Sequence, residues 1–400
     1  MQSKISDLYG AVDVVSDAAP RIKTEFLDIN GLNGQICAES VYSPTDYPIA
    51  DRSLMDGVAY NGQSADISKP MKLVQHLSAA EIFQGVLKGN NCVRLSTGSY
   101  LPDGADTIIP VEDVKIIRNK VNLLKRIPSG KFIEKRGDVF QKGDLVLSKG
   151  VQVDPWYVET LAALRINSVK VLSMPRLGIL STGSEITGQF SANGAIINSN
   201  YYALSSLLRR LNIPFGYMGV AHDNREVLAD TLRLAIETYD AVITFGGTAR
   251  GRYDLMHSVV SHDLKGKVEV NGVKATPGRT FRFAKVDGTP LFILPGTPAA
   301  ALVCSELFLT SWLLAYQGIP WRDATQPCRV TFGITKKAGF YKLMPCWYKM
   351  TEGRLTAFPR DRRETEAHRG VRSAMLILEP DATKLSCGDT APLFAVQSYF

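Results

Sequence analysis

The stretch RLGILSTG (176–183) decides the fold class, because an apolar run ends there in a polar turn that contains a glycine. AVITFGG (241–247) and LFILPG (291–296) repeat this pattern. Between these runs, apolar residues recur at helical spacing in NSNYYALSSLLRRLN (198–212) and REVLADTLRLAIETYD (225–240). Strands that alternate with helices predict a mostly parallel sheet inside a three-layer α/β domain.

The helices of this domain have recognisable starts. Ser199 or Asn200 can cap the first helix, and the D-x-x-E spacing of Asp223 and Glu226 is typical of a capping arrangement at the second. LFILPG runs directly into the most apolar stretch of the chain, from Pro298 to Tyr316. Polar residues interrupt that stretch, so it predicts a buried helix rather than a membrane span.

The sequence on either side of this domain is β-like. Residues 31–135 carry short β-type runs separated by Gly, Pro, Asn and Asp, which predict a small β-rich unit. Residues 138–164 predict an extended segment that leads into a helix, with Pro155 near the helix start. From about residue 325 onward, short branched and aromatic runs predict a C-terminal barrel or sandwich. A polar segment at 4–30 is compatible with a helix.

The bulk composition is that of a folded protein with several domains. The chain has 400 residues, 45% hydrophobic and 21% charged, and a formal net charge of +7. The basic balance is compatible with an ordinary basic protein or with an anionic ligand, and the absence of nucleic-acid-binding motifs argues against nucleic acid. Six scattered cysteines without a C-x-x-C motif, and no apolar leader, predict reduced thiols, a cytoplasmic location and no membrane partner.

Three turns are candidates for binding a phosphate-bearing ligand: STGSE (181–185), GGTARGRYD (246–254) and LPGTP (294–298). Each follows a predicted strand, where ligands bind in open α/β sheets, and glycines allow a ligand close to the backbone. Pro295 and Pro298 would make the third turn rigid. Each turn could equally be a tight structural connection, but three of them in one domain favour a ligand site.

Five carboxylates are candidates for holding Mg²⁺, which prefers oxygen ligands. They are Asp56, Asp138, Glu185, Asp223 and Asp254. Local alternatives exist for most of them, since Asp223 can cap a helix, Asp254 can cap the next helix, Asp56 can belong to an Asp-Gly turn and Asp138 can be a solvated surface charge. Composition alone does not choose between these interpretations.

The segment RDRRETEAHRGVR (360–372) carries five arginines. It is interpreted either as a solvated loop or as an arm that faces phosphate, because arginine presents a fork of donors to phosphate. The five histidines share no metal-binding spacing. The chain also lacks a P-loop, a G-x-G-x-x-G motif and a G-x-S-x-G nucleophile motif.

The order of the motifs resembles that of the MoeA family, and of the E domain of gephyrin, over nearly the whole chain. DRSLMDGVA resembles D-x-S-x-M-D-G-Y-A, and STG followed by LPDGAD resembles T-G-x-x-[LV]-P-x-G-A-D. LSTGSEI resembles S-T-G-D-E-L, and NSN before a leucine-rich helix resembles D-[ST]-N. The remaining matches are GVAHDN, DAVITFGGTARGRYD, ATPGRT and LPGTP.

The resemblance implies a multidomain α/β plus β fold. A linking domain would comprise 1–45 and 136–172, a β-rich second domain 46–135, a MogA-like αβα third domain 173–322, and a C-terminal β-barrel 323–400. It also implies an elongated homodimer whose site lies between the third domain of one subunit and the second domain of the other.

The resemblance further implies a molybdopterin molybdenumtransferase. Such an enzyme takes adenylylated molybdopterin and molybdate, releases AMP and forms molybdenum cofactor, with Mg²⁺ required. Possible protein partners are the molybdopterin adenylyltransferase and recipient molybdoenzymes. The family's catalytic acids fall on Asp56, Asp138, Glu185, Asp223 and Asp254, of which all but Asp138 are metal ligands. The substrate-binding positions implied are Thr97, Gly98, Ser181, Thr182, Gly183, Gly246, Gly247, Gly251, Pro277, Gly278, Arg279, Pro295, Gly296, Thr297 and Pro298.

Several family positions differ here. The aspartate of S-T-G-D-E is Ser184, the lysine before P-G is Thr276, and the asparagine of the L-P-G-N-P motif is Thr297. The acids are therefore kept while basic or donor groups are lost. Two alternatives follow: a divergent non-catalytic protein that binds the pterin or acts as a scaffold, and a transferase that adenylylates molybdopterin.

Overall fold

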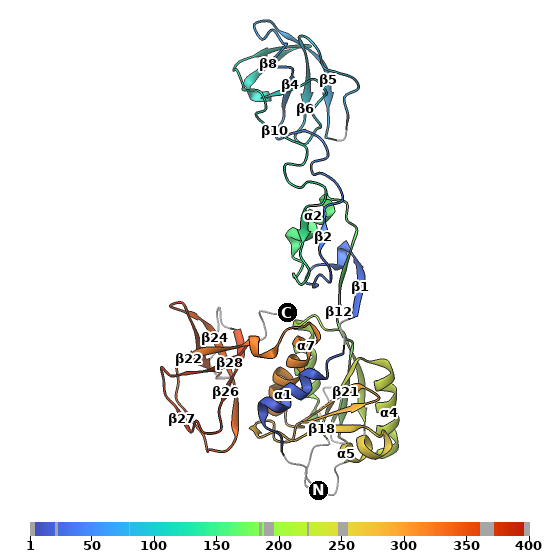
Figure 1. Ribbon diagram of the computed structural model, residues 1–400, viewed down its shortest axis with the longest axis vertical. Helices are drawn as coiled ribbons and strands as arrows, with labels where there is room; N and C mark the ends of the chain where they lie inside the picture. Colours follow the sequence, from blue (N-terminus) through green and yellow to red (C-terminus); the bar gives the residue numbers. More distant parts are fainter. Residues whose placement is uncertain are drawn as a thin grey trace. The chain divides into compact units, whose positions relative to one another are not determined.

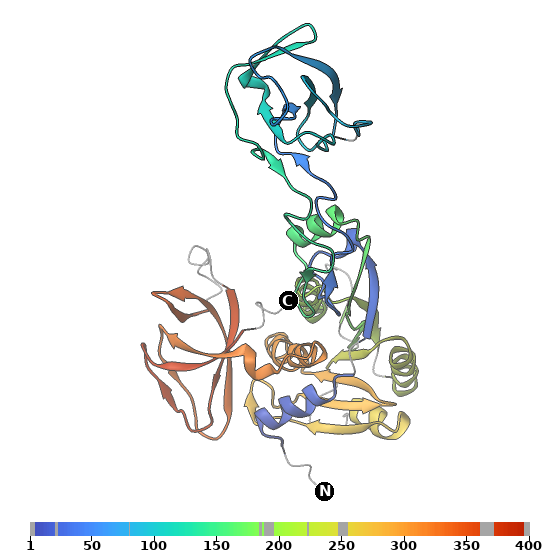
Figure 2. The same ribbon diagram turned by 45° about the horizontal axis from the view of Figure 1, so that its top comes forward.

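The computed structural model describes residues 5–20, 23–79, 81–183, 186–187, 196–221, 224–246, 255–360 and 372–395. The chain divides into two compact units, shown in Figures 1 and 2. The larger unit comprises residues 1–24 and 172–400, and the smaller unit comprises residues 25–171. The domain boundaries expected from the sequence are finer than this division and remain predictions.

A six-stranded sheet forms the centre of the larger unit. Its strands lie in the order β16 (Phe215–Ala221), β13 (Leu177–Thr182), β17 (Ala241–Phe245), β21 (Thr289–Leu294), β20 (Arg282–Val286) and β18 (Lys267–Asn271). The first four are parallel, as predicted, and β20 and β18 add an antiparallel edge. Asp287 and Gly288 join β20 to β21 with positive φ at both positions, which is the two-residue hairpin turn that an Asp-Gly pair favours.

Helices cover both faces of this sheet, which confirms the three-layer architecture (Figure 2). α1 (Leu8–Asp17), α3 (Ser199–Arg210) and the helix at 298–316 pack on one face, where the large core cluster lies. α4 (Arg225–Thr238) and α5 (Leu255–Ser258) pack on the other, followed by a π-helical turn at Val259–Asp263. The predicted N-terminal helical segment at 4–30 contains the α-helix α1, followed by β1 (Lys23–Asp28).

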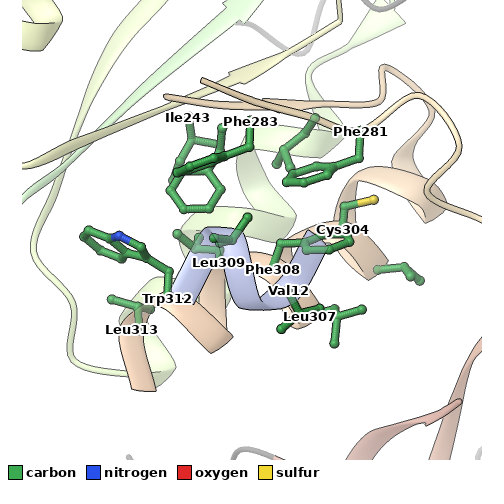
Figure 3. Close-up of a cluster of buried hydrophobic side chains, with 14 of the residues drawn as sticks. Val12, Ile243, Phe281, Phe283, Cys304, Leu307, Phe308, Leu309, Trp312 and Leu313 are labelled. Carbon is green, nitrogen blue, oxygen red and sulfur yellow. The ribbon is translucent and has the colours of Figure 1, made fainter. Parts of the chain in front are cut away.

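The helix at 298–316 is the main core helix. It consists of α6 (Pro298–Cys304), a π-helical turn η4 (Ser305–Leu309) and α7 (Thr310–Tyr316). Phe308 stacks on Phe281 with ring centroids 4.0 Å apart (Figure 3). Trp312 meets Phe292 edge to face. The helix is long and apolar enough to be a candidate membrane span by composition, but 72% of its most apolar window is buried in the protein, as a core helix requires.

A closed barrel completes the larger unit, so the predicted C-terminal β domain is a barrel rather than a sandwich. The strands follow the order β24 (Tyr341–Thr351), β25 (Arg354–Pro359), β22 (Thr325–Val330), β28 (Thr390–Phe394) and β26 (Arg372–Leu378), and β26 pairs back with β24. β19 (Ala275–Thr276) joins β24 from the α/β part of the chain, an addition that the sequence did not predict. The barrel encloses its own apolar cluster.

The smaller unit contains the predicted β-rich sheet. Its strands lie in the order β7 (Thr107–Pro110), β4 (Gly57–Tyr60), β6 (Asn91–Leu95), β5 (Met71–Leu77), β9 (Lys120–Leu123) and β8 (Val114–Ile117). Short pairs link segments that are far apart in the sequence: β3 (Arg52–Ser53) with β10 (Ile133–Glu134), and β2 (Val41–Tyr42) with β11 (Leu145–Leu147). The second of these pairs joins the two stretches that were predicted to form the linking domain.

Helix α2 (Pro155–Ala163) begins as predicted, with Pro155 in its first turn and Asp154 Oδ1 accepting a hydrogen bond from Tyr157 N. β12 (Ser168–Ser173) follows it and pairs with β1. The remaining short elements are β14 (Ile186–Thr187), β15 (Ile196–Ile197), β23 (Ile334–Thr335), β27 (Lys384–Leu385) and the 3₁₀ turns Ile29–Gly31, Val111–Asp113 and Trp321–Ala324.

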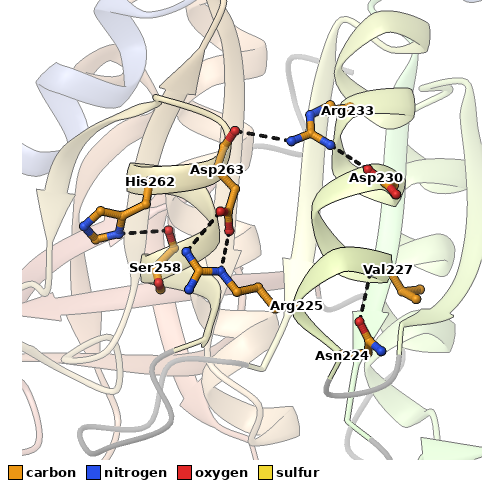
Figure 4. Close-up of polar contacts among 8 residues, drawn as sticks. All are labelled: Asn224, Arg225, Val227, Asp230, Arg233, Ser258, His262 and Asp263. Carbon is orange, nitrogen blue, oxygen red and sulfur yellow. Dashed lines mark hydrogen bonds and ion pairs between the residues drawn. The ribbon is translucent and has the colours of Figure 1, made fainter.

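The caps of the α/β helices differ from those predicted, which were Ser199 or Asn200 for α3 and Asp223 for α4. Asn198 caps α3, with its Oδ1 accepting from Tyr201 N at 3.2 Å. Asn224 caps α4, with its Oδ1 accepting from Val227 N at 3.2 Å (Figure 4). Asparagine takes the extended or bridging backbone of a cap as readily as aspartate does, so side-chain type alone did not locate the cap. Because Asn224 fills the capping role, Asp223 is not needed as a cap.

Candidate functional site

The turns after β13, β17 and β21 meet at one edge of the parallel sheet, where they were predicted to lie together. Thr182 Oγ1 donates to Phe245 O at 2.6 Å, and Gly246 N donates to Leu294 O at 3.1 Å. A Cβ added to Gly296 would lie 3.6 Å from Gly246 Cα. The carboxyl ends of three neighbouring strands thus form one small surface of backbone and hydroxyl groups, which is the usual ligand position in open α/β sheets.

Gly246 must be glycine in this arrangement. Its φ is +88°, and an added Cβ would lie 2.8 Å from Thr182 Oγ1 and 3.1 Å from Thr182 O. Both the left-handed backbone and the close approach exclude a side chain. The chain therefore keeps the β13 and β17 turns in direct contact.

The connections at this edge leave toward opposite faces of the sheet. The chain after β13 leads to α3 on one face, whereas the chain after the adjacent β17 leads to α5 on the other. Neighbouring strands with diverging connections leave a crevice between them, so this is the topological switch point of the sheet.

Two asparagines of the NSN segment tie these turns together. Asn198 Nδ2 donates to Ser181 Oγ at 2.8 Å and to Tyr217 OH at 2.9 Å. Asn200 Nδ2 donates to Gly296 O at 2.8 Å. Asn198 and Asn200 are both nearly fully buried. The sequence predicts a motif and a helix cap at NSN, but not this positioning role. Paired asparagines at a helix start were the available signal.

The turn at 294–298 carries the two prolines from which a rigid loop was predicted. Pro295 is buried, Gly296 and Thr297 are exposed, and Pro298 is the first residue of α6. Thr297 occupies the N-cap position without a side-chain capping bond among the described residues, so its hydroxyl is not committed to the helix. Free N–H groups at the start of α6 can receive an anion.

A second group of predicted residues lies in the smaller unit, where Asp56 and the Thr97-Gly98 motif are brought together. Asp56 Oδ1 accepts hydrogen bonds from Thr97 N at 2.7 Å and from Thr97 Oγ1 at 2.9 Å. These two donors hold the pKa of the exposed Asp56 carboxyl below its usual value. Asp56 is therefore ionised at neutral pH, as a metal ligand must be.

Asp138 has a more local role. Its Oδ2 accepts from Lys135 N at 2.8 Å, which closes its own turn, and its side chain is exposed. Asp46 fixes the neighbouring residues, because its carboxylate accepts from Arg136 Nε at 2.6 Å and from Lys142 N at 2.9 Å. Asp138 therefore belongs to a well-held turn whose carboxylate is already partly engaged.

The segment Pro277-Gly278-Arg279 lies beside the barrel. Of these three residues, Arg279 borders a cavity of about 340 Å³, here called the basic groove, together with Lys336, Lys337, Phe340 and Lys342. The Arg279 guanidinium lies 5.5 Å from the centroid of the Phe340 ring. Lys336 Nζ donates hydrogen bonds to the carbonyl oxygens of Phe340 and Pro380. The three barrel lysines were missed, since the sequence gives no sign that 336–342 folds against 276–279.

Five predicted residues, Glu185, Asp223, Gly247, Gly251 and Asp254, lie outside the described residues, as does most of the arginine-rich segment. Among the described residues, no group of three or more His, Cys, Asp or Glu side chains is placed to hold a metal ion. The described part of the proposed Mg²⁺ set is therefore Asp56 alone. All six cysteines are free thiols, and five of them are buried.

The comparisons with known proteins agree with this architecture. Residues 7–164 match the family model of the MoeA N-terminal region (domain I and II), and residues 178–315 match that of a probable molybdopterin binding domain. A molybdopterin molybdenumtransferase of Haemophilus influenzae is 31% identical over 299 residues, which is 74% of each chain. One of Nostoc sp. is 32% identical over 290 residues, 70% of this chain and 66% of the relative.

A solved structure extends the likeness to nearly the whole chain. The molybdopterin biosynthesis MoeA protein from Pyrococcus horikosii superimposes with a TM-score of 0.76 at 26% identity, covering 98% of this chain and 99% of that one. Fold and site therefore define a multidomain protein of molybdenum cofactor biosynthesis with a molybdopterin-binding α/β domain. Within that class, the chain belongs to the MoeA family.

Proposed function

We propose that the chain is a molybdopterin molybdenumtransferase that inserts molybdate into adenylylated molybdopterin and releases AMP. The observation that carries this proposal is the meeting of the Ser181-Thr182-Gly183, Gly246 and Pro295–Pro298 turns at the switch point of the sheet. Curated relatives of similar sequence have the name of this enzyme. The residues proposed to bind the substrate are the substrate-binding positions that the family resemblance implies. The proposed domains are the four that the same resemblance implies.

In this proposal, Mg²⁺ is held by Asp56, Glu185, Asp223 and Asp254, and Asp138 supports catalysis. The metal would neutralise charge on the departing AMP phosphate. The protein's own contribution is to keep the carboxylate ionised and to point backbone donors at the oxyanion. The pair Asp56–Thr97 performs the first task, and the start of α6 performs the second.

The direct test is AMP release from adenylylated molybdopterin with Mg²⁺, with and without molybdate. Molybdate-dependent release supports the transferase. Binding of the pterin without release would instead identify the divergent binding protein, which the loss of family donors at Thr276 and Thr297 favours. ATP consumption with molybdopterin in the absence of molybdate would identify the adenylylating enzyme. The proposed setting is the cytoplasm, with the adenylyltransferase and recipient molybdoenzymes as partners.

Arg279 is expected to hold the anionic ligand in the basic groove. Replacing Arg279 by glutamine should weaken binding of the adenylylated substrate by about ten- to a hundredfold, because a hydrogen bond to a charged group contributes roughly 1.5–3 kcal/mol. Equilibrium dialysis measures this loss directly. Arg354→Gln, on a barrel hairpin outside the groove, is the matched control. If the Arg279 variant and the wild type bind the adenylylated substrate with equal affinity, the groove is not part of the substrate site.

We also propose that the functional unit is a homodimer. Tyr42 and Leu145 lie directly opposite each other on β2 and β11, yet they are 57% and 51% exposed. We take this exposed apolar pair as the candidate contact with a second copy of the chain. Leu145→Asp should therefore weaken self-association by at least about tenfold, since burying an unpaired charge costs more than 1.4 kcal/mol. Sedimentation velocity measures this, with Leu124→Asp, 61% exposed, as the matched control. An unchanged dimer in both variants would locate the interface elsewhere.

A further inference from the structure

A separate cavity of about 270 Å³ lies between α3, the π-helical turn η4 and the barrel. Its polar lining consists of Ser206, Arg210, Glu306, Trp347, Arg360 and Ser373. Arg210, Glu306 and Ser373 also border a small adjoining void with room for about one water molecule. None of these residues belongs to the turns at the switch point or to the basic groove.

Two guanidinium groups reach this cavity from different elements. Arg210, at the C-terminal end of α3, donates from Nη1 to Ser373 Oγ at 3.2 Å. Arg360, which follows β25, lies with its guanidinium carbon 5.0 Å from the centroid of the Trp347 ring. Stacking on an aromatic face orients a guanidinium while leaving its edge donors available. The two arginines are thus held by different contacts on either side of one small space.

The one carboxylate in the lining is only weakly paired. Glu306 Oε1 and Arg210 Nη2 are 4.0 Å apart, which is the outer limit of an ion pair. The Glu306 side chain is 16% exposed and sits in the π-helical turn of the core helix. A π-helical turn often marks a functional position. Arg210 could therefore turn its donors to an incoming anion at little cost in lost pairing.

We propose that this cavity binds a small tetrahedral dianion of the phosphate class, which neither the MoeA family assignment nor the proposed transferase reaction requires. Two forked guanidinium groups and the Ser206 hydroxyl supply donors that a tetrahedral oxyanion accepts. Because drug-sized ligands occupy about 300–1,000 Å³, the cavity suits phosphate or a short phosphomonoester better than a whole nucleotide.

Glu306 determines the direction in which the binding affinity should change with pH. Burial raises the pKa of its carboxyl, against the opposing charges of Arg210 and Arg360, and Cys346 is the other titratable group that faces it. A bound dianion repels ionised Glu306, so binding takes up a proton at Glu306 and becomes tighter as the pH falls toward the ligand's own second pKa, which is about 6 for a phosphomonoester. A site in which Glu306 served only to pair with Arg210 would not behave in this way.

The test is titration of the full-length protein with inorganic phosphate and, separately, with glycerol phosphate. Calorimetry and tryptophan fluorescence report binding between about pH 6.5 and pH 8, above the second pKa of a phosphomonoester. Glu306→Gln should tighten binding by about tenfold at the upper pH and flatten the pH dependence, as a change of one pKa unit would. Arg360→Gln should weaken binding by at least about tenfold. Trp347→Phe should remove the fluorescence change while calorimetric binding persists.

The controls separate binding from folding and from turnover. Arg372→Gln changes an arginine that lies near the cavity but does not line it, and its affinity should equal that of the wild type. Circular dichroism establishes that each variant is folded. Tighter binding of glycerol phosphate than of phosphate would identify a phosphomonoester as the ligand. No binding of either probe by folded wild type, or weaker binding by Glu306→Gln, would overturn the proposal whatever the result for AMP release.

Discussion

Replacing Asp56 by alanine is expected to lower molybdate-dependent AMP release by at least about a hundredfold, the usual effect of removing a group that stabilises developing charge. Asp56 is the described member of the proposed metal set, and Thr97 fixes one of its oxygens with two hydrogen bonds. Removing the carboxylate leaves the metal with one ligand fewer and the phosphate charge less neutralised. Initial rates of AMP release with saturating Mg²⁺ and molybdate measure the change.

Thr97→Val is the matched control for Asp56→Ala. It removes the Oγ1 donor at 2.9 Å but keeps the backbone N–H bond at 2.7 Å. Because both donors lower the pKa of Asp56, the variant should move that pKa up toward its ordinary value, so activity should be lost at a slightly higher pH on acidification. Turnover at neutral pH should fall only a few-fold. If Asp56→Ala releases AMP at the wild-type rate, Asp56 has no role in the reaction.

One departure from the family motifs, at Asn198, falls where side-chain contacts join the turns. Asn198 takes the place of the family aspartate in D-[ST]-N, and its amide donates to both Ser181 and Tyr217. An aspartate could accept but not donate these hydrogen bonds. The switch-point turns are thus joined by amide donors here. A retained fold with altered polar groups is consistent with altered ligand affinity rather than with lost architecture.

Much of the fold was predictable because its signals are local. Apolar runs that end in glycine-containing turns predicted the strands β13, β17 and β21. Apolar residues at helical spacing predicted the helices α3 and α4. The antiparallel strands β18 and β20 were missed, although the Asp287-Gly288 turn between β20 and β21 was a visible signal. β19 was not predictable, because a two-residue strand is defined only by its partner β24, more than sixty residues later in the chain.

The residues of the candidate site were likewise predictable from the sequence only in part. Residues in glycine-rich or Asp-Gly motifs, such as Asp56, Thr97 and Gly246, stand out in the sequence. The basic groove does not stand out in the sequence, because Lys337 and Lys342 come close to Arg279 only when the barrel folds against it. The cavity of Arg210 and Arg360 is likewise created by packing between elements about 150 residues apart. Motifs reveal backbone requirements, whereas charge clusters built by tertiary contact leave no local pattern.

Leu309→Ala is expected to lower the free energy of unfolding of the larger unit by about 3–5 kcal/mol, the range for a leucine removed from a rigid core. Leu309 is fully buried on the π-helical turn, in the cluster that contains Phe281, Phe308 and Trp312 (Figure 3). Aromatic rings that are already stacked cannot collapse into the space left behind, so the cavity persists. Urea denaturation followed by far-UV circular dichroism measures the loss.

Leu234→Ala provides the matched comparison, because it makes the same substitution at a side chain that is 59% exposed on α4. Its effect should stay within about 0.5 kcal/mol, since little apolar area is removed from contact. The core helix also carries Pro298 at the switch-point edge and Glu306 at the anion cavity. A comparable loss of stability in both variants would mean that helix 298–316 is not the rigid element from which both sites are built.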